Sequence, residues 1–231
     1  MKKKSKRYNN LLKKIDLNSN FEIESAVDIL KDLSGINFIE SVEVHAKLGV
    51  DSKQADQQVR GTVVLPNGTG KNIRVLVITK DDRFEEAKTA GADYVGNEDI
   101  LQKIKSENWF DFDCIVTTPE MMVKVSSLGK ILGPKGLMPN PKSGTITNDI
   151  AKTIKEIKLG KIEYKLDKSN IVHAVIGKVS FGAEKLVENF NALLNAIVKS
   201  RPSASKGKYI KSLFISSTMG PGIKLNISKL I

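Results

Sequence analysis

The sequence has few of the residues on which many active sites and stabilising crosslinks depend. Its 231 residues include one cysteine and two histidines. This excludes an intrachain disulfide framework and a multi-cysteine zinc site, and it leaves little material for a histidine-based metal centre. No uninterrupted apolar run approaches the roughly 20 residues that span a bilayer, and no apolar stretch follows the basic N-terminus, so no secretory signal is expected. These absences favour a soluble, intracellular protein.

Positive charge is what the sequence has in excess. It has 37 Lys and Arg, of which only five are Arg, against 26 Asp and Glu, so its formal net charge is +11. Apolar residues make up 40%, which is enough to bury a core. Such a charge on a globular protein indicates a polyanionic partner.

The excess charge is distributed unevenly along the chain. Residues 67–159 carry a net charge of +1, whereas residues 1–66 and 160–231 together carry +10. The boundaries coincide with Pro66–Gly70 and Leu159–Gly160, and clusters of proline and glycine are typical of turns and hinges. We therefore expect a near-neutral domain inserted into a basic domain that both chain ends form. A chance clustering of solvated surface charges is the alternative.

The middle segment alternates strand-like and helix-like patterns, which predicts a small parallel α/β unit. Short β-branched runs indicate buried strands, and charged or amphipathic stretches between them indicate helices. The expected elements are strands at 72–80, 93–95 and 114–116 and helices at 82–90, 98–105 and 150–157.

The flanking segments instead show strict apolar–polar alternation, which is typical of strands with one buried face. Amphipathic helices accompany these strands, so the flanks predict an α+β sandwich with the other sheet face or the edges free for a partner. The expected strands lie at 42–48, 162–166, 209–217 and 223–227, and the helices at 23–33 and 183–198.

Enzymatic motifs are incomplete throughout the chain. No Gly-Lys pair is followed by Ser or Thr, and Gly68–Gly70 precedes a strand and lacks the third glycine of a dinucleotide fingerprint. Cys114 lies in a strand-like run and is expected to be a buried, inert thiol. Spacing suggests no carboxylate partner for His45 or His173. We expect no enzyme, cofactor or metal, with a small nucleotide-dependent enzyme on the middle domain as the alternative.

Three loops remain as candidate contact sites. Leu128–Gly144 is rich in glycine and proline, which suits a surface connection and, equally, a rigid loop against another macromolecule. Pro202–Lys208 is a basic loop before a strand, and Ser216–Gly222 follows that strand. Hydroxyl groups beside glycines can form hydrogen bonds with sugar and phosphate oxygens of a nucleic acid. Clusters of this composition are also typical of ordinary turns.

Taken together, these stretches resemble one family, that of ribosomal protein L-one. The match runs from Lys6-Arg7-Tyr8 to the C-terminus, and the order and spacing of its parts make it specific. The matching stretches are VEVHAKLGVD (Val42–Asp51), DQQVRGTVVLP (Asp56–Pro66), AGADYVG (Ala90–Gly96), LGKILGPKGLMPNPKSGT (Leu128–Thr145), DKSNIVHAVIGKVSF (Asp167–Phe181) and STMGPG (Ser217–Gly222).

The resemblance implies an α+β fold in two domains. Residues 1–66 and 160–231 are expected to form a split β-α-β RNA-binding domain, and residues 67–159 an inserted Rossmann-like α/β domain. As implied function, the protein is a structural constituent of the large ribosomal subunit. It binds the large-subunit ribosomal RNA of the mobile stalk near the tRNA exit site, assists release of deacylated tRNA and represses translation of its own messenger RNA.

The implied partners are large-subunit ribosomal RNA, exit-site tRNA, the protein's own messenger RNA and other large-subunit components, with no membrane. The expected location is the ribosome of a bacterial cytoplasm or a plastid stroma. A free translational regulator outside the ribosome is the alternative.

The resemblance also places RNA contacts on particular residues. Many bacterial members have Lys where this chain has Asn37, so one charged contact is absent. Without the resemblance, the residues are equally consistent with Phe38 as a core residue and with Met219 as a side chain that fills a gap in the packing. The Thr218 hydroxyl and the Gly220 backbone are expected to approach RNA directly. The expected RNA-binding residues are Phe38, Ser41, Glu43, Lys206, Ser212, Thr218, Met219 and Gly220.

Overall fold

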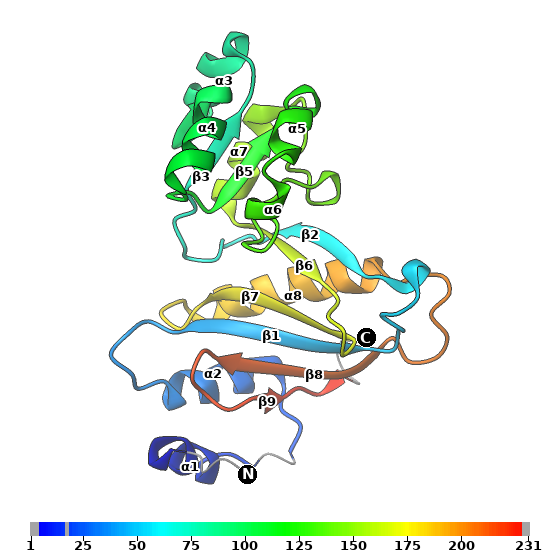
Figure 1. Ribbon diagram of the computed structural model, residues 1–231. Coiled ribbons are helices and arrows are strands. Elements are labelled where there is room, and N and C mark those ends of the chain that lie inside the picture. The colour runs from blue at the N-terminus through cyan, green and yellow to red at the C-terminus, as the bar shows by residue number, and fades with distance from the viewer. Residues whose placement is uncertain (1–4, 17–18, 228–231) are drawn as a thin grey trace. The chain divides into compact units, whose positions relative to one another are not determined.

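The computed structural model describes residues 5–16 and 19–227 (Figure 1). The chain divides into two compact units: a terminal unit of Met1–Gly70 and Ile162–Ile231, and a middle unit of Lys71–Lys161. The expected mixture of α and β structure is confirmed, with three separate sheets. No helix within the described residues is long and apolar enough to cross a membrane.

A four-stranded antiparallel sheet is the centre of the terminal unit. Its order is β7-β1-β8-β9, so β1 pairs with strands that follow it by more than a hundred residues. In the register, His45 of β1 lies opposite His173 of β7 on one side and Phe214 of β8 on the other. The strands are β1 (Ser41–Leu48), β7 (Ile171–Lys178), β8 (Ile210–Ser217) and β9 (Ile223–Lys224).

Two amphipathic helices, α2 (Ile23–Leu33) and α8 (Ala183–Lys199), pack against one face of this sheet (Figure 1). Their apolar residues form a single core with the buried alternate residues of β1. Those residues are Val42, Val44, Ala46 and Leu48. Because side chains alternate along a strand, Ser41, Glu43 and His45 lie on the opposite, partly exposed face.

Two smaller elements complete the terminal unit. The helix α1 (Lys6–Lys13) begins at Ser5, whose hydroxyl accepts a hydrogen bond from the Tyr8 N–H at 3.2 Å. The strands β2 (Arg60–Val64) and β6 (Lys161–Lys165) form a second sheet, after the short helix η1 (Ala55–Gln57).

A buried amide in α8 holds the chain where it leaves the terminal unit. Asn189 is fully buried, and its side chain accepts from the Asn67 N–H at 3.0 Å. It donates to the carbonyls of Gly68 and Ile176 at 2.9 and 2.7 Å. One polar residue on the apolar face of a helix thus satisfies backbone groups of a turn and of β7.

The middle unit is a three-stranded parallel sheet between two layers of helices. Its strand order is β4-β3-β5, with β3 (Val75–Ile78) between β4 (Tyr94–Gly96) and β5 (Cys114–Thr117). One face packs Val75 and Val77 against α3 and α7, and the other packs Leu76 and Ile78 against α4 and α5. The helices are α3 (Phe84–Thr89), α4 (Glu98–Glu107), α5 (Pro119–Ser126), α6 (Gly129–Leu132) and α7 (Ile150–Leu159), with short η2 (Asp81–Arg83) and η3 (Pro141–Ser143).

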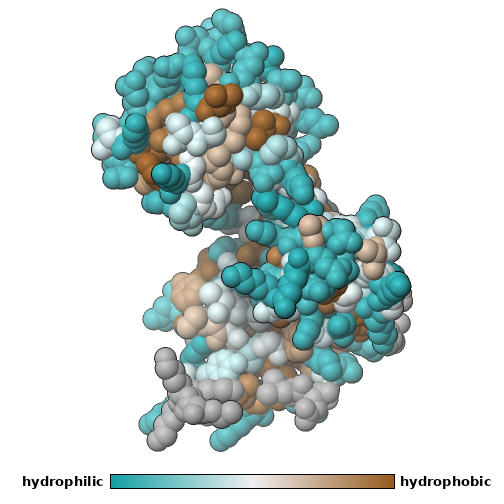
Figure 2. Space-filling model, turned by 45° about the vertical axis from the view of Figure 1, so that its right-hand side comes forward, coloured by the Kyte–Doolittle hydropathy of each residue, from teal (hydrophilic) through white to brown (hydrophobic). Residues whose placement is uncertain are grey.

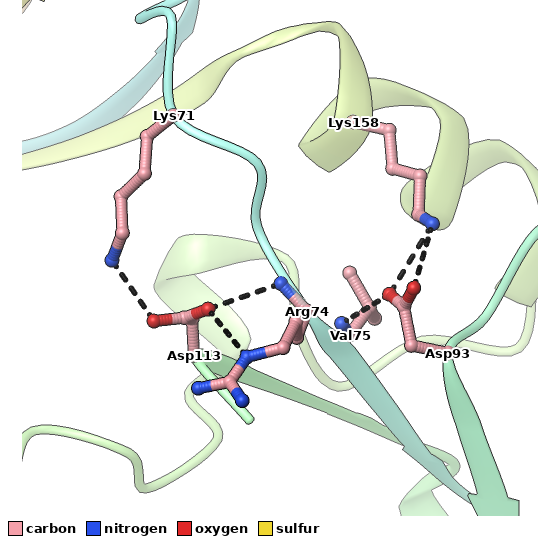
Figure 3. Close-up of polar contacts among 6 residues, drawn as sticks. All are labelled: Lys71, Arg74, Val75, Asp93, Asp113 and Lys158. Carbon is pink, nitrogen blue, oxygen red and sulfur yellow. Dashed lines mark hydrogen bonds and ion pairs between the residues drawn. The ribbon is translucent and has the colours of Figure 1, made fainter. Parts of the chain in front are cut away.

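At the amino ends of these strands, two carboxylates accept hydrogen bonds from backbone N–H groups and from basic side chains (Figure 3). Asp113 accepts from Lys71 Nζ at 2.9 Å and from the Arg74 N–H at 3.1 Å. The hydrogen bond from Lys71 contributes most to holding the pKa of Asp113 below its usual value. Asp93 accepts from the Val75 N–H at 2.8 Å and from Lys158 Nζ at 3.2 Å.

The structure differs from the expected elements in several places. The final strand, expected over 223–227, is Ile223–Lys224, because the chain then pairs with Phe21 through Leu225 and Asn226. The helix α5 was not expected; it begins at Pro119, and proline is well suited to the first position of a helix. The helix α1 and the strand β2 were also not expected, because their apolar patterns are short.

Candidate nucleic-acid interface

Antiparallel pairing brings the start of β1 beside the end of β8. The Thr218 N–H donates to the Ser41 carbonyl at 3.1 Å, and the Ser41 N–H donates to the Thr218 hydroxyl at 3.0 Å. The same hydroxyl lies 3.3 Å from the Ser41 carbonyl oxygen. Two expected RNA-binding residues that are 177 positions apart in the sequence are therefore neighbours.

The buried carboxylate of Glu40 fixes the turn that follows β8. Glu40 is 2% exposed, and its Oε1 accepts from the Met219 N–H at 2.8 Å and from the Ser217 hydroxyl at 3.1 Å. From α1, Arg7 donates to the Met219 carbonyl at 2.7 Å. The backbone of the turn is thus held from both sides, and Gly220 N–H closes it onto the Ser217 carbonyl at 3.1 Å.

Large apolar side chains are exposed at this end of the sheet. Phe38 is 53% exposed, Ile39 63% and Met219 52%. Phe38 and Ile39 also line a shallow cavity of about 190 Å³ with Glu40 and Val179. Phe38 is therefore not a core residue, and an exposed aromatic ring beside fixed polar groups suits stacking of an unpaired base.

A lysine and an arginine bring positive charge to the same place. Lys178, the last residue of β7, donates to the Ser41 hydroxyl at 2.9 Å, and Arg7 contacts the Met219 carbonyl. The terminal unit as a whole carries 22 Lys and Arg against 13 Asp and Glu. In Figure 2, hydrophilic residues gather toward the right-hand side of this unit, and residues of intermediate or apolar character cover much of the remainder. We call Phe38, Ile39, Glu40, Ser41, Lys178, Thr218, Met219 and Gly220 the strand-end cluster.

The other expected RNA-binding residues lie outside the strand-end cluster. Glu43 is one step along β1, on the partly exposed sheet face, opposite Ser216. Ser212 lies opposite Lys47, toward the other end of β8. Lys206 is exposed in the loop before β8. The structure thus brings together five of the eight expected residues, places Glu43 and Ser212 farther along the sheet, and leaves Lys206 in a loop.

Two of the five have roles within the protein that the sequence did not indicate. A Cβ on Gly220 would lie 2.4 Å from the Ser217 hydroxyl oxygen. A side chain at this position would therefore clash with Ser217 whether or not RNA is bound. The Thr218 hydroxyl already bonds to the Ser41 backbone. Substitutions at these two positions are therefore expected to affect the protein's own structure as well as any contact with RNA.

Sequence reasoning missed Glu40, Ile39, Lys178 and Arg7. A glutamate directly before an alternating strand gives no sign of burial, since glutamate is seldom buried unless it is paired. Lys178 could have been found, because it ends an alternating strand and its position on the partly exposed face follows from the period of two.

A histidine pair crosses the centre of the partly exposed sheet face. The Nδ1 atoms of His45 and His173 lie 2.7 Å apart, and His45 Nε2 lies 2.9 Å from the Ser216 hydroxyl. His173 Nε2 is 3.5 Å from Asp167, so a carboxylate partner exists that spacing did not suggest. Burial, and then the proximity of His173, lower the pKa of His45.

The Gly/Pro-rich loop 128–144 of the middle unit is braced internally. The Asn140 side chain accepts from the Lys142 N–H at 2.8 Å, and the Thr145 hydroxyl accepts from the Asn140 N–H at 2.8 Å. Lys135 Nζ lies 3.5 Å from the centre of the Phe110 ring. These contacts give the loop a defined shape with exposed lysines. Cys114, expected to be buried, is partly exposed.

No group of three or more potential metal ligands occurs among the residues that the structure describes. In the comparison with known families, residues 30–221 match the family described as the "Ribosomal protein L1p/L10e family". The matched range includes the whole middle unit and every expected RNA-binding residue.

Proposed function

The chain belongs to the ribosomal protein L1p/L10e family, and from this premise we propose that its strand-end cluster binds the ribosomal RNA of the mobile stalk. Membership in the family implies a structural, non-enzymatic role in the large ribosomal subunit and binding of large-subunit ribosomal RNA. We assign RNA binding to the terminal unit as a split β-α-β domain. The middle unit is then an inserted Rossmann-like domain.

The observation that carries the proposal is the pairing of exposed Phe38 and Met219 with a turn whose backbone is already fixed. Binding RNA immobilises flexible groups at a cost in free energy, and a turn held by Glu40 and Arg7 has already lost that freedom. Phe38 offers a stacking surface, while Lys178 and the net charge of the unit attract phosphates. These features support recognition of a particular RNA shape in addition to non-specific electrostatic attraction to RNA.

A second basic surface of the terminal unit supports the proposal that exit-site tRNA is also contacted. Lys53, Lys165 and Lys168 line an open cavity of about 700 Å³ with Ser52 and Gln58. Lysines around an open hollow suit a phosphate backbone. Contact with tRNA here, with the stalk RNA held at the strand-end cluster, would couple the protein to release of deacylated tRNA.

Repression of the protein's own messenger RNA follows from the same cluster. A fixed turn with an exposed aromatic side chain recognises a local RNA shape and not a cellular location. A messenger RNA segment that presents the shape of the stalk RNA would therefore compete for the site.

Alanine substitutions at Phe38 and Met219 test the assignment. Phe38→Ala and Met219→Ala each remove exposed apolar surface, so affinity for a stalk ribosomal RNA fragment is expected to fall about tenfold to a hundredfold, the range of one lost stacking contact. Melting temperature should change little, because both side chains are about half exposed. Electrophoretic mobility shift or fluorescence anisotropy measures the affinity.

Val123 offers a matched control, since it is an apolar side chain 78% exposed on α5 of the middle unit. Val123→Ala should leave affinity for the fragment unchanged. Equal affinity of the Phe38 and Met219 variants and the parent protein would refute the assignment of the site.

A further inference from the structure

Buried polar atoms without partners follow the carboxyl ends of all three strands in the middle unit. Thr79 comes directly after β3, Asn97 after β4 and Thr118 after β5. Among the described residues, Thr79 Oγ1, Asn97 Oδ1 and Thr118 Oγ1 have no hydrogen-bond partner. Such atoms are rare in native structures, because burying them without a partner costs free energy.

The unpartnered polar atoms of the described residues are confined to the carboxyl ends of the strands, as neighbouring positions show. Thr117 is also fully buried, but its hydroxyl donates to the Ile78 carbonyl at 3.1 Å. At the amino ends of the strands, Asp93 and Asp113 accept hydrogen bonds from backbone and lysine donors (Figure 3). The three polar atoms at the carboxyl ends have no such donor or acceptor within the described residues, so a partner from outside the protein would satisfy them.

The topology places these atoms where parallel α/β sheets bind ligands. The chain goes from β3 to β4 on one side and then crosses to β5 on the other, so the direction of winding reverses beside β3. The crevice outside the carboxyl ends of the strands at such a reversal is the usual ligand position in open α/β sheets. Thr79 and Thr118 follow the two strands that border it.

A small cavity lies at this position. Its volume is about 210 Å³, and Thr79 and Thr118, which are 0% and 5% exposed, line it. Lys80 and Arg83 also line it, together with the carboxylates of Asp82 and Glu120, and Arg83 donates to the carbonyl of Asn148 at 2.8 Å. The helix α5 begins beside it with no side chain capping its N-terminus. Hydroxyls, two cations and the positive end of a helix are the donors that a phosphate group requires.

We propose that the middle unit binds a phosphate group in this cavity, through the hydroxyls of Thr79 and Thr118 and the positive charges of Lys80 and Arg83. A phosphate oxygen, or a water held under it, supplies the acceptor that the two hydroxyls lack. The cavity is smaller than the roughly 300–1,000 Å³ of pockets that enclose organic ligands. Inorganic phosphate or the phosphate end of a nucleotide therefore fits, whereas a nucleoside does not.

Glu120 competes with this anion. Its carboxylate lies 2.6 Å from Lys80 Nζ at the cavity, and both side chains are more than half exposed. Because exposed ion pairs contribute little to stability, phosphate can displace Glu120 from Lys80 at small cost. Removing the negative charge of Glu120 should then strengthen binding, which is the opposite of what removing a ligand-binding group does.

The full chain, isotope-labelled, can be titrated with inorganic phosphate, adenosine 5′-monophosphate and adenosine at constant ionic strength. We expect the amide resonances of Thr79 and Thr118 to shift saturably with both phosphates and not with adenosine. If phosphate alone shifts them, the source is the free anion. If the nucleotide binds more tightly than phosphate, the source is a phosphate terminus. An equal response to adenosine, or no shift at these amides, overturns the proposal.

Variants separate binding from folding. Thr79→Val and Thr118→Val remove unpartnered hydroxyls, so melting temperature should hold or rise while phosphate affinity falls about tenfold. Thr117→Val is the matched control: it should lower the melting temperature, because the Thr117 hydroxyl is bonded, yet leave phosphate affinity unchanged. Glu120→Gln should strengthen binding about two- to fivefold. Unchanged affinity in both Thr79→Val and Thr118→Val would also overturn the proposal.

Discussion

At the scale of single residues, the carboxylate of Glu40 has the largest structural role in the strand-end cluster. It is 2% exposed and accepts hydrogen bonds from the Ser217 hydroxyl and the Met219 N–H. A buried acceptor with two donors cannot be removed without leaving both donors unsatisfied. The stability of the turn and the proposed RNA recognition therefore involve the same oxygen atom.

Glu40→Ala tests this dependence. It should lower the free energy of unfolding by about 1–3 kcal/mol, the cost of orphaned buried donors, and weaken RNA binding by loosening the turn. Glu40→Gln keeps an acceptor oxygen in place and should retain most of the stability and most of the RNA affinity. Urea unfolding and RNA titration of the two variants measure these effects. Equal behaviour of Glu40→Ala and the parent protein would show that the turn does not need its carboxylate.

At the scale of elements, the three long strands β7, β1 and β8 of the terminal unit are linked through the histidine pair. His45 of β1 contacts His173 of β7 through Nδ1 and Ser216 of β8 through Nε2. With Asp167 accepting the Nε2 proton of His173, His173 Nδ1 accepts from His45 Nδ1–H, and His45 Nε2 accepts from the Ser216 hydroxyl. This arrangement uses neutral imidazole rings. Two fully protonated rings would direct two N–H groups at each other.

Stability should consequently fall as the pH is lowered through about 6.5. The pKa of His45 is lowered in the folded protein, so near its ordinary value the unfolded chain binds more protons and acid favours unfolding. The loss should level off below the lowered pKa. Urea unfolding between pH 8 and 5 measures it.

His45→Gln should flatten this pH dependence, and His173→Gln should reduce it only in part, because burial is the larger cause of the lowered pKa. The lowered pKa of Asp167, due chiefly to the hydrogen bond from the Ile171 N–H, affects stability at a lower pH, below about 4. An unchanged slope in His45→Gln would assign the effect to another group.

At the scale of the whole molecule, charge and shape contribute separately to RNA binding. The net charge of +11 predicts an affinity that falls linearly with salt on a log–log plot. The uncharged residues of the strand-end cluster, such as Phe38 and Met219, add contacts that release few counterions, so part of the affinity should survive at high salt. The ribosome is a polyanionic environment that suits this charge.

Two variants distinguish the contributions. Lys178→Gln should reduce the magnitude of the salt slope by about 0.7–0.9, the value for one phosphate contact. Phe38→Ala should lower the affinity at every salt concentration and leave the slope unchanged. Affinities for the stalk RNA fragment at four or more salt concentrations give both quantities. A slope that accounts for all of the affinity would indicate non-specific polyanion binding.

Local patterns in the sequence were sufficient for much of the fold. The alternation in residues 42–48 and the helical spacing in 23–33 and 183–198 match β1, α2 and α8 closely, because burial on one face imposes a period on the chain. The strand β2 and the helix α1 were missed because β2 has no fully buried residue and α1 buries only Leu11, so burial on one face imposes little periodicity on them.

By itself, the sequence determined the segregation of charge between its middle and its ends, the periods of its longer helices and strands, and the family to which it belongs. Only the tertiary structure decided that Ser41 meets Thr218, that His45 meets His173 and that Glu40 is buried. It likewise decided that three unpartnered polar atoms follow the strands of one sheet. The physical reason is that periodicity is a property of neighbours along the chain, whereas these contacts depend on strand order and register, which residues more than a hundred positions apart establish together.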